Sequence, residues 1–495
     1  MKKKLVSALL CATMMAGCLT FAGCGGSDGG SSDNGGAADN GGAADDGGAA
    51  DDGGAADDGG AADEGTAADG EGEGEEIDFS GTFGDESGTP LSVWTFVDQH
   101  ATFYGKMVEK WNEANPDKKI YLTATAYPFA DMHNKMLMSF QAGEGAPDII
   151  DIEMGQFPNA VEGLDTWLYP LDDAIAPYKD DMVQSRLESY QGEDGHYYGA
   201  PFHVGATVMY YNLGELEQYG IKQEDVDAVK TWDDWKALGK KYVDARGEEG
   251  KFWTSVDTGG TDWMWISMAQ HGEDWSGDGT NPNVQIESVK KMLEFEKGML
   301  DEGIAQVSPD GIVDNETGFK NITSKNIVAF PKAAWYMSRF IKEMPDEEGN
   351  WYIAPCPVFE EGQPRSVGIG GTGTVVTQQS QNKELAAEFL CYAKMSPDGE
   401  KVIWEDLGFD VCNTSLWDQD DFAHDKSNVY NTFFRNMPYD VLNEIKDEIG
   451  LIKMHKITLT IAEQFNLTVF NEIFESGRDI DEMLQEAQDA IELEL

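Results

Sequence analysis

The stretch LSVWTFVDQHATFYGKMVEKWNEANPDKKIYLTATA, residues 91–126, decides the fold class of this 495-residue chain. It opens with an apolar, strand-like run at 91–96. Residues 102–115 then carry apolar side chains at helical spacing, and residues 120–125 alternate as a second strand. A strand, a helix and another strand in this order predict an α/β fold with a mainly parallel sheet covered by helices.

Polar side chains follow two strands of this predicted sheet. A helical pattern at 132–142 leads into a third apolar run at 147–152, and Glu153 and Gln156 come directly after it. Ligands of such sheets bind outside the carboxyl ends of the strands. We therefore expect one crevice to be lined by the polar residues that follow strands one and three, namely Asp98, Gln99, Glu153 and Gln156. The histidines His100 and His203 are expected to have structural roles.

The N-terminus has the features of a targeting segment. Three lysines precede a mostly apolar run, and residues 1–23 are predicted to be a signal peptide that ends in Phe21-Ala22-Gly23-Cys24. This ending resembles the lipobox of bacterial lipoproteins, in which the cysteine receives a diacylglycerol and fatty acids such as palmitate. Cys24 is the preferred lipidation site, Cys18 is a second candidate, and an ordinary secretory signal is the alternative.

Residues 24–87 are predicted to be a disordered tether. The segment repeats hexads of Gly, Ala and Asp that contain nothing large enough to bury. The signal contributes +3 and the tether −19 to the net charge of −56, which leaves −40 on the residues beyond Thr89. So acidic a surface repels nucleic acid and anionic membranes, so that no nucleic-acid partner is expected.

Neither a metal nor another cofactor is expected. Cys356, Cys391 and Cys412 are widely spaced without any CxxC motif, which favours three separate buried thiols over a zinc site, although one disulfide stays possible. The run from Asp274 to Gly279 is similar to the start of a calcium-binding loop. Its twelfth position is Gln285 instead of a bidentate glutamate, which favours a surface turn.

The folded part is too long for one core, so two lobes are predicted. Six segments in order resemble the extracellular solute-binding proteins of ABC sugar importers, the group that contains maltodextrin-binding protein. They are GEGAPDIIDIE (143–153), GHYYGAPFHVGATVMYYN (195–212), TWDDWKALGKK (231–241), NWYIAPCPVFEEGQPRSVGIGGTG (350–373), QNKELAAEFLCYAKMSPDGEK (381–401) and IFESGRDIDEMLQEAQDAI (473–491). Within that group, WTFVDQHATFYGKMVEKWNEANPDKKI and FADMHNKML look most like the lactose/arabinose-type binding proteins.

The resemblance implies the type II fold of periplasmic binding proteins, in which two α/β lobes are joined by hinge segments. Lobe one would comprise 88–203 and 358–413, and lobe two would comprise 205–355 and 417–495. The hinges would then lie near Pro201–Gly205, Pro355–Pro357 and Thr414–Leu416.

The family's ligand contacts can be carried over to further positions of this chain. Trp335 matches a tryptophan that stacks on sugar, and Trp263 falls among aromatic pocket residues. The resemblance also implies ligand contacts at Asp262, Gly370, Gly371 and Phe465. Gly205 and Ile152 replace two maltose contacts of maltodextrin-binding protein, which argues against maltose specificity.

The implied function is sugar capture for import. The chain would be a monomer that is lipid-anchored on the extracellular face of the membrane of a Gram-positive bacterium. It would deliver a mono- or oligosaccharide to ABC permease subunits and would not be an enzyme. Two alternatives are an anchored polysaccharide hydrolase and an adhesion lipoprotein, and the sequence contains neither a nucleophile elbow nor an HExxH pair.

Overall fold

The computed structural model describes residues 77–161, 163–450 and 452–495. The predicted signal segment, Cys18, Cys24 and most of the predicted tether lie outside the described residues. Within the described ranges, no helix is both long and apolar enough to cross a bilayer.

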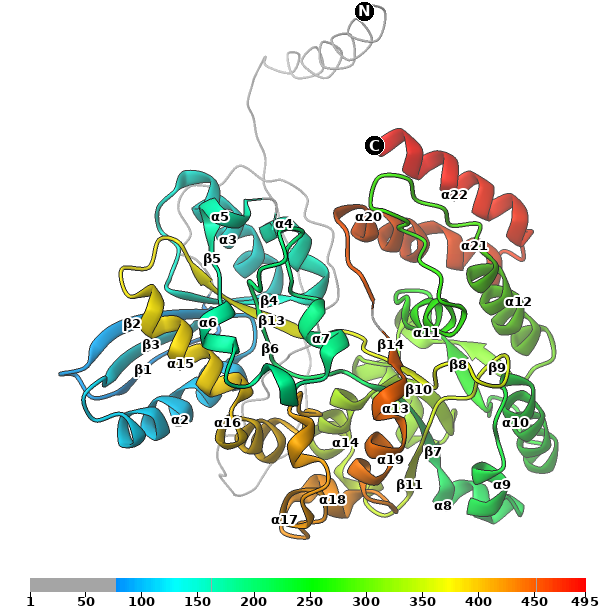
Figure 1. The fold of residues 1–495 in the computed structure, drawn as a ribbon. Helices are drawn as coiled ribbons and strands as arrows, with labels where there is room; N and C mark the ends of the chain where they lie inside the picture. Colours follow the sequence, from blue (N-terminus) through cyan, green and yellow to red (C-terminus); the bar gives the residue numbers. More distant parts are fainter. Residues whose placement is uncertain (1–76, 162, 451) are drawn as a thin grey trace, which may run out of the picture. The chain divides into compact units, whose positions relative to one another are not determined.

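Lobe one is built on a mixed sheet whose order is β1-β3-β2-β4-β13-β5, with β6 also paired to β13 (Figure 1). The central strands β3, β2 and β4 are parallel, as predicted, whereas β1 and β13 are antiparallel to their neighbours. The strands are β1 (Phe79–Gly84), β2 (Thr89–Thr95), β3 (Ile120–Ala126), β4 (Ile149–Glu153), β5 (Leu168–Tyr169), β6 (Ala200–Pro201) and β13 (Thr372–Thr377).

Strand β1 corrects the predicted end of the tether at residue 87. Its residues alternate between half-buried and exposed positions, and the Phe79 and Phe83 rings stack with their centroids 6.4 Å apart. Both rings pack against the core on the side of helix α2 (Asp98–Ala114). The two phenylalanines supply the apolar face that the Gly-Ala-Asp hexads lack, so the folded chain begins earlier than predicted.

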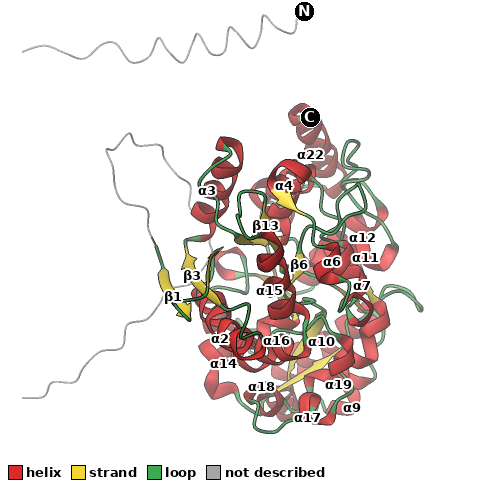
Figure 2. Cartoon of the chain, turned by 60° about the vertical axis from the view of Figure 1, so that its left-hand side comes forward, coloured by secondary structure: helices red, strands yellow, loops and turns green. Residues whose placement is uncertain are grey.

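Helices cover both faces of this sheet (Figures 1 and 2). One face packs against α2 and α15, and the other against α3 and α4. The helices of this lobe are α2, α3 (Phe129–Ala142), α4 (Phe157–Val161), α5 (Leu164–Trp167), α6 (Asp172–Ile175), α7 (Gln184–Glu188), α15 (Lys383–Met395) and α16 (Pro397–Val402).

Lobe two has a three-stranded antiparallel sheet with β7 (Thr207–Asn212) between β10 (Ala329–Ala333) and β11 (Trp351–Ala354). Two short parallel pairs accompany it: β8 (Thr254–Val256) with β9 (Ala305–Val307), and β12 (Ser366–Val367) with β14 (Ile449–Gly450). Its helices include α8 (Leu213–Leu216), α9 (Gln223–Asp227), α10 (Trp232–Arg246), α11 (Asp262–His271), α12 (Glu287–Asp301), α13 (Glu316–Thr323), α14 (Met337–Glu343), α20 (Lys456–Gln464), α21 (Phe470–Phe474) and α22 (Ile480–Glu494).

Three further short helices, α17 (Asp420–Ala423), α18 (Val429–Phe433) and α19 (Pro438–Ile445), follow the last crossing between the lobes. Their aromatic side chains join a core cluster that also contains β2, β3 and α14. This cluster is therefore continuous from the sheet of lobe one to the helices of lobe two.

The second crossing between the lobes lies later than predicted. Val358 pairs with Thr231 of lobe two, and the backbone N–H of Cys356 donates to the carbonyl of Arg365. The chain thus stays in lobe two through β12 and enters lobe one only at β13. Pro355 and Pro357 therefore lie in a loop of lobe two and not in a hinge. Proline is as common in turns as in hinges, so these two residues did not by themselves identify a crossing.

The three predicted thiols are free and buried. Cys356, Cys391 and Cys412 form no disulfide with one another, which confirms the interpretation as separate thiols. Burial raises the pKa of each thiol, so none is a reactive thiolate at neutral pH.

Candidate functional site

The polar tips of lobe one lie at one edge of its sheet. Strands β2 and β4 are parallel with Trp94 opposite Ile150, so their carboxyl ends lie side by side. Asp98 and Gln99 are exposed at the start of α2, and Asp98 Oδ1 accepts a hydrogen bond of 2.7 Å from the Gln99 backbone N–H. Both side chains keep most of their hydrogen-bonding capacity for a ligand.

Glu153 ends β4 and is half-buried. Its Oε2 accepts a 2.6 Å hydrogen bond from the backbone N–H of Gly155. Burial raises the pKa of the Glu153 carboxyl from its ordinary 4.5 to about 7, against the opposing effect of backbone N–H groups. Near neutral pH this group can therefore either donate to or accept from a hydroxyl. Gln156 lies one turn further, and its Oε1 accepts a 3.1 Å hydrogen bond from Asn159.

The two histidines for which structural roles were predicted, His100 and His203, are buried. His100 Nδ1 lies 3.4 Å from a carboxylate oxygen of Asp151 inside lobe one. His203 packs against Phe409 with ring centroids 4.6 Å apart, and burial holds the pKa of its imidazole well below the ordinary value. Of the polar residues that end the first strand, only Asp98 and Gln99 are available to a ligand.

Trp335 of lobe two reaches the backbone that leads into β13. It follows β10, its ring is half-buried, and its Nε1 donates a 3.1 Å hydrogen bond to the carbonyl of Ile369. Two residues later, the carbonyl of Gly371 accepts a 2.8 Å hydrogen bond from the backbone N–H of Met154. The segment 369–371 between β12 and β13 thus bonds Trp335 through Ile369 and Met154, the neighbour of Glu153, through Gly371.

Gly370 and Gly371 occupy positions that only glycine fits well. Both have positive φ, +67° and +114°. A Cβ at Gly370 would lie 3.2 Å from Nε1 of Trp335. The glycines allow the indole to approach this backbone closely.

Two cations flank the Trp335 ring. Lys332 Nζ lies 6.0 Å and Arg339 Cζ 5.9 Å from the ring centroid. Lys332 pairs with Asp262 at 2.7 Å, and Arg339 Nε donates to Asp314 at 2.9 Å. Because each cation has its own carboxylate, this part of lobe two offers hydrogen-bonding groups without a strong excess of positive charge.

Trp263 and Phe465 lie in the core of lobe two, contrary to their predicted ligand contacts. Trp263 is 4% exposed and packs against Trp232 and Trp235, with centroids 5.6 and 5.9 Å away. Phe465 has no exposed surface and packs against Trp275 at 4.8 Å. Neither ring has a free face for a ligand.

Two buried residues at the first crossing were missed by sequence analysis. Arg186 donates to the carbonyl of Val204 and lies 2.8 Å from the sulfur of Met154. Asp410 accepts hydrogen bonds from the backbone N–H groups of Gly205 and Ala206, at 3.1 and 2.7 Å. These two charged residues hold the backbone between the lobes. Nothing in the local sequence distinguishes them from charged residues on the surface.

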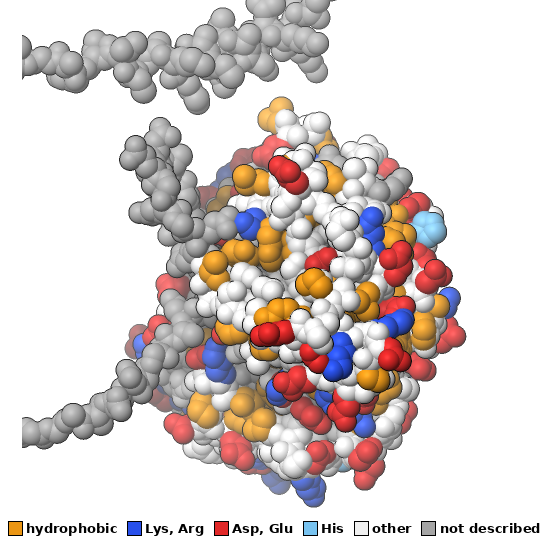
Figure 3. Space-filling view, turned by 90° about the vertical axis from the view of Figure 1, so that its left-hand side faces the viewer, with side chains coloured by type: hydrophobic (Ala, Val, Ile, Leu, Met, Phe, Trp, Pro, Cys, Tyr) orange, Lys and Arg blue, Asp and Glu red, His pale blue; other side chains and the backbone are white. Residues whose placement is uncertain are grey.

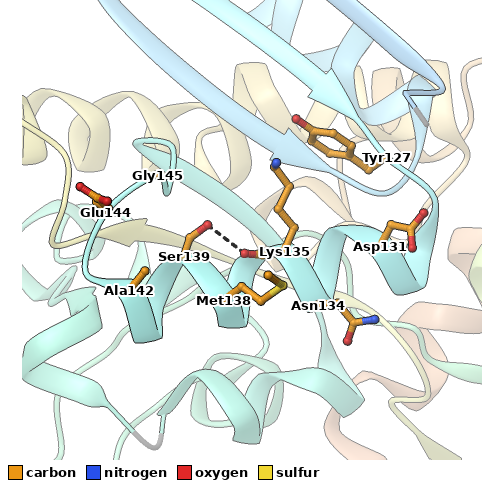
Figure 4. Close-up of a pocket in the computed structure, with 9 residues that line it drawn as sticks. All are labelled: Tyr127, Asp131, Asn134, Lys135, Met138, Ser139, Ala142, Glu144 and Gly145. Carbon is orange, nitrogen blue, oxygen red and sulfur yellow. Dashed lines mark hydrogen bonds between the residues drawn. The ribbon is translucent and has the colours of Figure 1, made fainter. Parts of the chain in front are cut away.

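A groove of about 860 Å³ lies along α3 and does not include the predicted ligand contacts (Figure 4). It is lined by one face of the helix, by Tyr127 and by the loop at Glu144 and Gly145. Lys135 lies over the rings of Trp94 and Tyr127, 5.0 and 5.4 Å from their centroids. Because a single helix supplies most of the lining, the groove lacks the convergent polar groups of a ligand site.

The segment that resembles a calcium loop is a hydrogen-bonded turn. Asp278 Oδ1 accepts from the backbone N–H groups of Thr280 and Asn281 at 2.9 and 3.0 Å. No group of three or more His, Cys, Asp or Glu side chains is arranged to hold a metal among the described residues.

Comparisons with known proteins agree with this architecture. Residues 94–394 match the family described as bacterial extracellular solute-binding protein. The chain is 37% identical over 409 residues to an arabinooligosaccharide-binding protein of Halalkalibacterium halodurans, covering 82% of this chain and 90% of that relative. It is 36% identical over 392 residues to an arabinooligosaccharide-binding protein of Bacillus subtilis, covering 78% and 88% of the two chains. The solved structure of the sugar-binding protein MalE of Xanthomonas citri superimposes with a TM-score of 0.67 at 17% identity, over 81% of this chain and 96% of that one.

Proposed function

The chain belongs to the bacterial extracellular solute-binding protein family, and we propose that it captures a neutral oligosaccharide of the arabinooligosaccharide type for an ABC importer. The ligand binds between the two lobes and is handed to the permease subunits. As a member of a binding-protein family, the chain is not a hydrolase. The two relatives that are at least 36% identical both carry the name arabinooligosaccharide-binding protein, which supports this ligand class.

The hydrogen bonds that join Trp335, residues 369–371 and Met154 carry this proposal. They bring the half-buried indole of lobe two and the residue next to Glu153 of lobe one to the same backbone segment, 369–371. A sugar needs a flat apolar ring for its C–H face and planar polar groups for its hydroxyls. Trp335 supplies the ring, and the carboxylates and amides of lobe one supply the polar groups.

The proposed contacts come from both lobes and from the crossing strand. They are Asp98, Gln99, Glu153 and Gln156 from lobe one, Gly370 and Gly371 from the crossing, and Asp262 and Trp335 from lobe two. Trp263 and Phe465 are left out because both rings are enclosed by the core.

The charge of the chain supports an uncharged ligand. Acidic residues outnumber basic ones by 91 to 35, so a carboxylated or phosphorylated sugar would be repelled on approach. Figure 3 shows lysine and arginine side chains scattered among acidic ones on one face of lobe one, without a continuous basic patch there.

The cell-surface location depends on the N-terminal segment. In this proposal Cys24 carries the lipid, and the tether between Cys24 and β1 holds a monomeric binding protein off the outer face of the membrane. Radiolabelled palmitate should be incorporated into the wild-type chain and lost in Cys24→Ser, whereas Cys18→Ser should still be labelled. If labelling is lost only in Cys18→Ser, Cys18 is the lipidated residue instead of Cys24.

Calorimetric titration with a panel of sugars tests the ligand. The panel contains arabinose, arabinobiose to arabinotetraose, lactose and maltotriose, and each mixture is analysed afterwards for cleavage. We expect saturable binding to arabinooligosaccharides without product formation. Cleavage would support a hydrolase, and the absence of binding to any sugar would favour an adhesion lipoprotein.

A further inference from the structure

An exposed phenylalanine lies at the carboxyl edge of the lobe-one sheet. Phe129 is the first residue of α3 and 40% of its surface is exposed. Its ring contacts Phe96, which follows β2, with centroids 5.3 Å apart and planes at 80°. The two rings therefore pack edge to face, while a large part of the Phe129 side chain remains exposed.

The ring is held in place by His133 from the next turn of α3. The Phe129 and His133 rings have centroids 4.5 Å apart, and His133 Nδ1 donates a 2.7 Å hydrogen bond to the carbonyl of Phe129. The other nitrogen, Nε2, accepts a 3.1 Å hydrogen bond from the backbone N–H of Glu153. Phe129 is thus fixed relative to a residue of the proposed ligand site.

His133 is neutral under physiological conditions. Burial lowers the pKa of its imidazole from 6.5 to about 4. The donor at Nδ1 and the acceptor at Nε2 are therefore constant above about pH 5, so the link between Glu153 and Phe129 does not change with ordinary changes of pH.

The strand register places the aromatic pair beside the polar tips. Thr95 lies opposite Ala126, so Phe96 and Phe129 extend beyond the ends of two adjacent parallel strands. Asp98 follows β2 and Glu153 is the last residue of β4, and these two strands end at the same edge. An exposed aromatic ring next to carboxylates is the combination that binds the C–H face and the hydroxyls of a sugar ring.

Helix formation does not explain a phenylalanine at this position. Pro128 is the residue before the helix and its side chain makes no capping hydrogen bond. The first turn of a helix favours polar and acidic residues, and an exposed aromatic gains little there.

We propose that Phe129, oriented by His133 and Phe96, is a second stacking surface that takes a sugar ring further along the oligosaccharide than the ring held by Trp335. The inference rests on the proposed function and adds a chain-length preference to it. Longer ligands reach both aromatic faces, whereas a monosaccharide reaches only one.

Titration of Phe129→Leu with arabinobiose, arabinotriose and arabinotetraose tests this inference. Leucine keeps apolar contact with Phe96 and His133 but removes the flat face. We expect the Kd for arabinotetraose to rise about fivefold to tenfold and the Kd for arabinobiose to change by less than about twofold. Phe129→Tyr, which keeps the ring, should retain the wild-type preference.

Met138→Ala is the matched control, because Met138 lies on the same helix, is 69% exposed and is two to three turns away. It should bind all three sugars as the wild type does. If Phe129→Leu weakens the binding of all three oligosaccharides equally, or of none, the proposal of a second stacking surface is wrong. If the wild type binds none of the three sugars, the proposed function itself fails.

Discussion

The ammonium group of Lys394 lies 3.7 Å from the carboxylate of Asp151, and neither side chain has any exposed surface. Asp151 also accepts hydrogen bonds from the hydroxyls of Tyr104 and Thr374, at 2.7 and 2.6 Å. Burial alone would raise the pKa of Asp151, but Lys394 and His100 hold it below its ordinary value. The pair joins α15 to β4 directly beneath the strand end that carries Glu153.

Removing the cation of this pair should destabilise the protein. Lys394→Met leaves Asp151 buried without its ammonium partner, and we expect the free energy of unfolding to fall by about 3 to 5 kcal/mol. Urea unfolding followed by tryptophan fluorescence measures the change. The double variant Lys394→Met/Asp151→Asn should recover most of the loss, and a single variant as stable as the wild type would contradict the role of the pair.

Replacement of Trp335 should separate stacking from hydrogen bonding. Trp335→Ala is expected to weaken oligosaccharide binding by about tenfold or more, because it removes the aromatic face. Trp335→Phe keeps a ring but loses the donor to the carbonyl of Ile369, so a smaller loss of about threefold is expected. Calorimetry gives both values, and wild-type affinity in Trp335→Ala would refute the site.

Glu153 should make stability depend on pH. Its folded pKa of about 7 lies above the ordinary 4.5, so its stabilising neutral form is fully present below pH 4.5 and is lost as the pH rises through 7. Glu153→Gln removes this loss. The stability of the variant relative to the wild type should therefore increase by about 1 to 3 kcal/mol between pH 5 and pH 8.

Urea unfolding of both proteins at the two pH values measures this difference. Glu144→Gln, which removes one exposed carboxylate, controls for the change in net charge. A relative stability that stays constant between pH 5 and pH 8 would show that Glu153 is not the titrating group.

A side chain at Gly205 should destabilise the first crossing between the lobes. The φ of Gly205 is +67°, and a Cβ there would lie 2.4 Å from the carbonyl oxygen of Ile369. Gly220 has a similar φ of +76° and open space around the same position. Both Gly205→Ala and Gly220→Ala incur the cost of a positive φ, about 1 kcal/mol, and only the former adds a clash with backbone.

We expect Gly205→Ala to lose about 1 to 3 kcal/mol more than Gly220→Ala in urea unfolding. It should also weaken ligand binding, because the displaced carbonyl belongs to the residue that receives the Trp335 hydrogen bond. Equal losses in the two variants would mean that the crossing can relax around a methyl group.

The pattern of strands and helices in lobe one was predictable from sequence, because its buried strands are short apolar runs bounded by turn residues. Strand β1 was missed because Phe79 and Phe83 are isolated aromatics in a glycine-rich stretch. Helix α3 begins at Phe129, three residues before the predicted start at 132, so that Phe129 did not enter the predicted site.

The candidate site was predictable only where a strand end or the family resemblance marked it. Trp263 and Phe465 were placed wrongly because both lie on helices whose neighbouring residues are also apolar, and such a sequence does not reveal which side faces a ligand. Arg186, Asp410 and Lys394 could not be found, because buried charges that pair across long sequence distances have the same local sequence as exposed ones.

Strand β13 lies between β4 and β5, yet Thr374 and Asp151, which it brings together, are 223 residues apart in the chain. When β1 to β6 have been synthesised, the sheet therefore still lacks the strand between β4 and β5. Most of lobe two must be synthesised before that strand is added. The half of the protein that is made first is thus completed late, and its folding rate depends on closing this long loop.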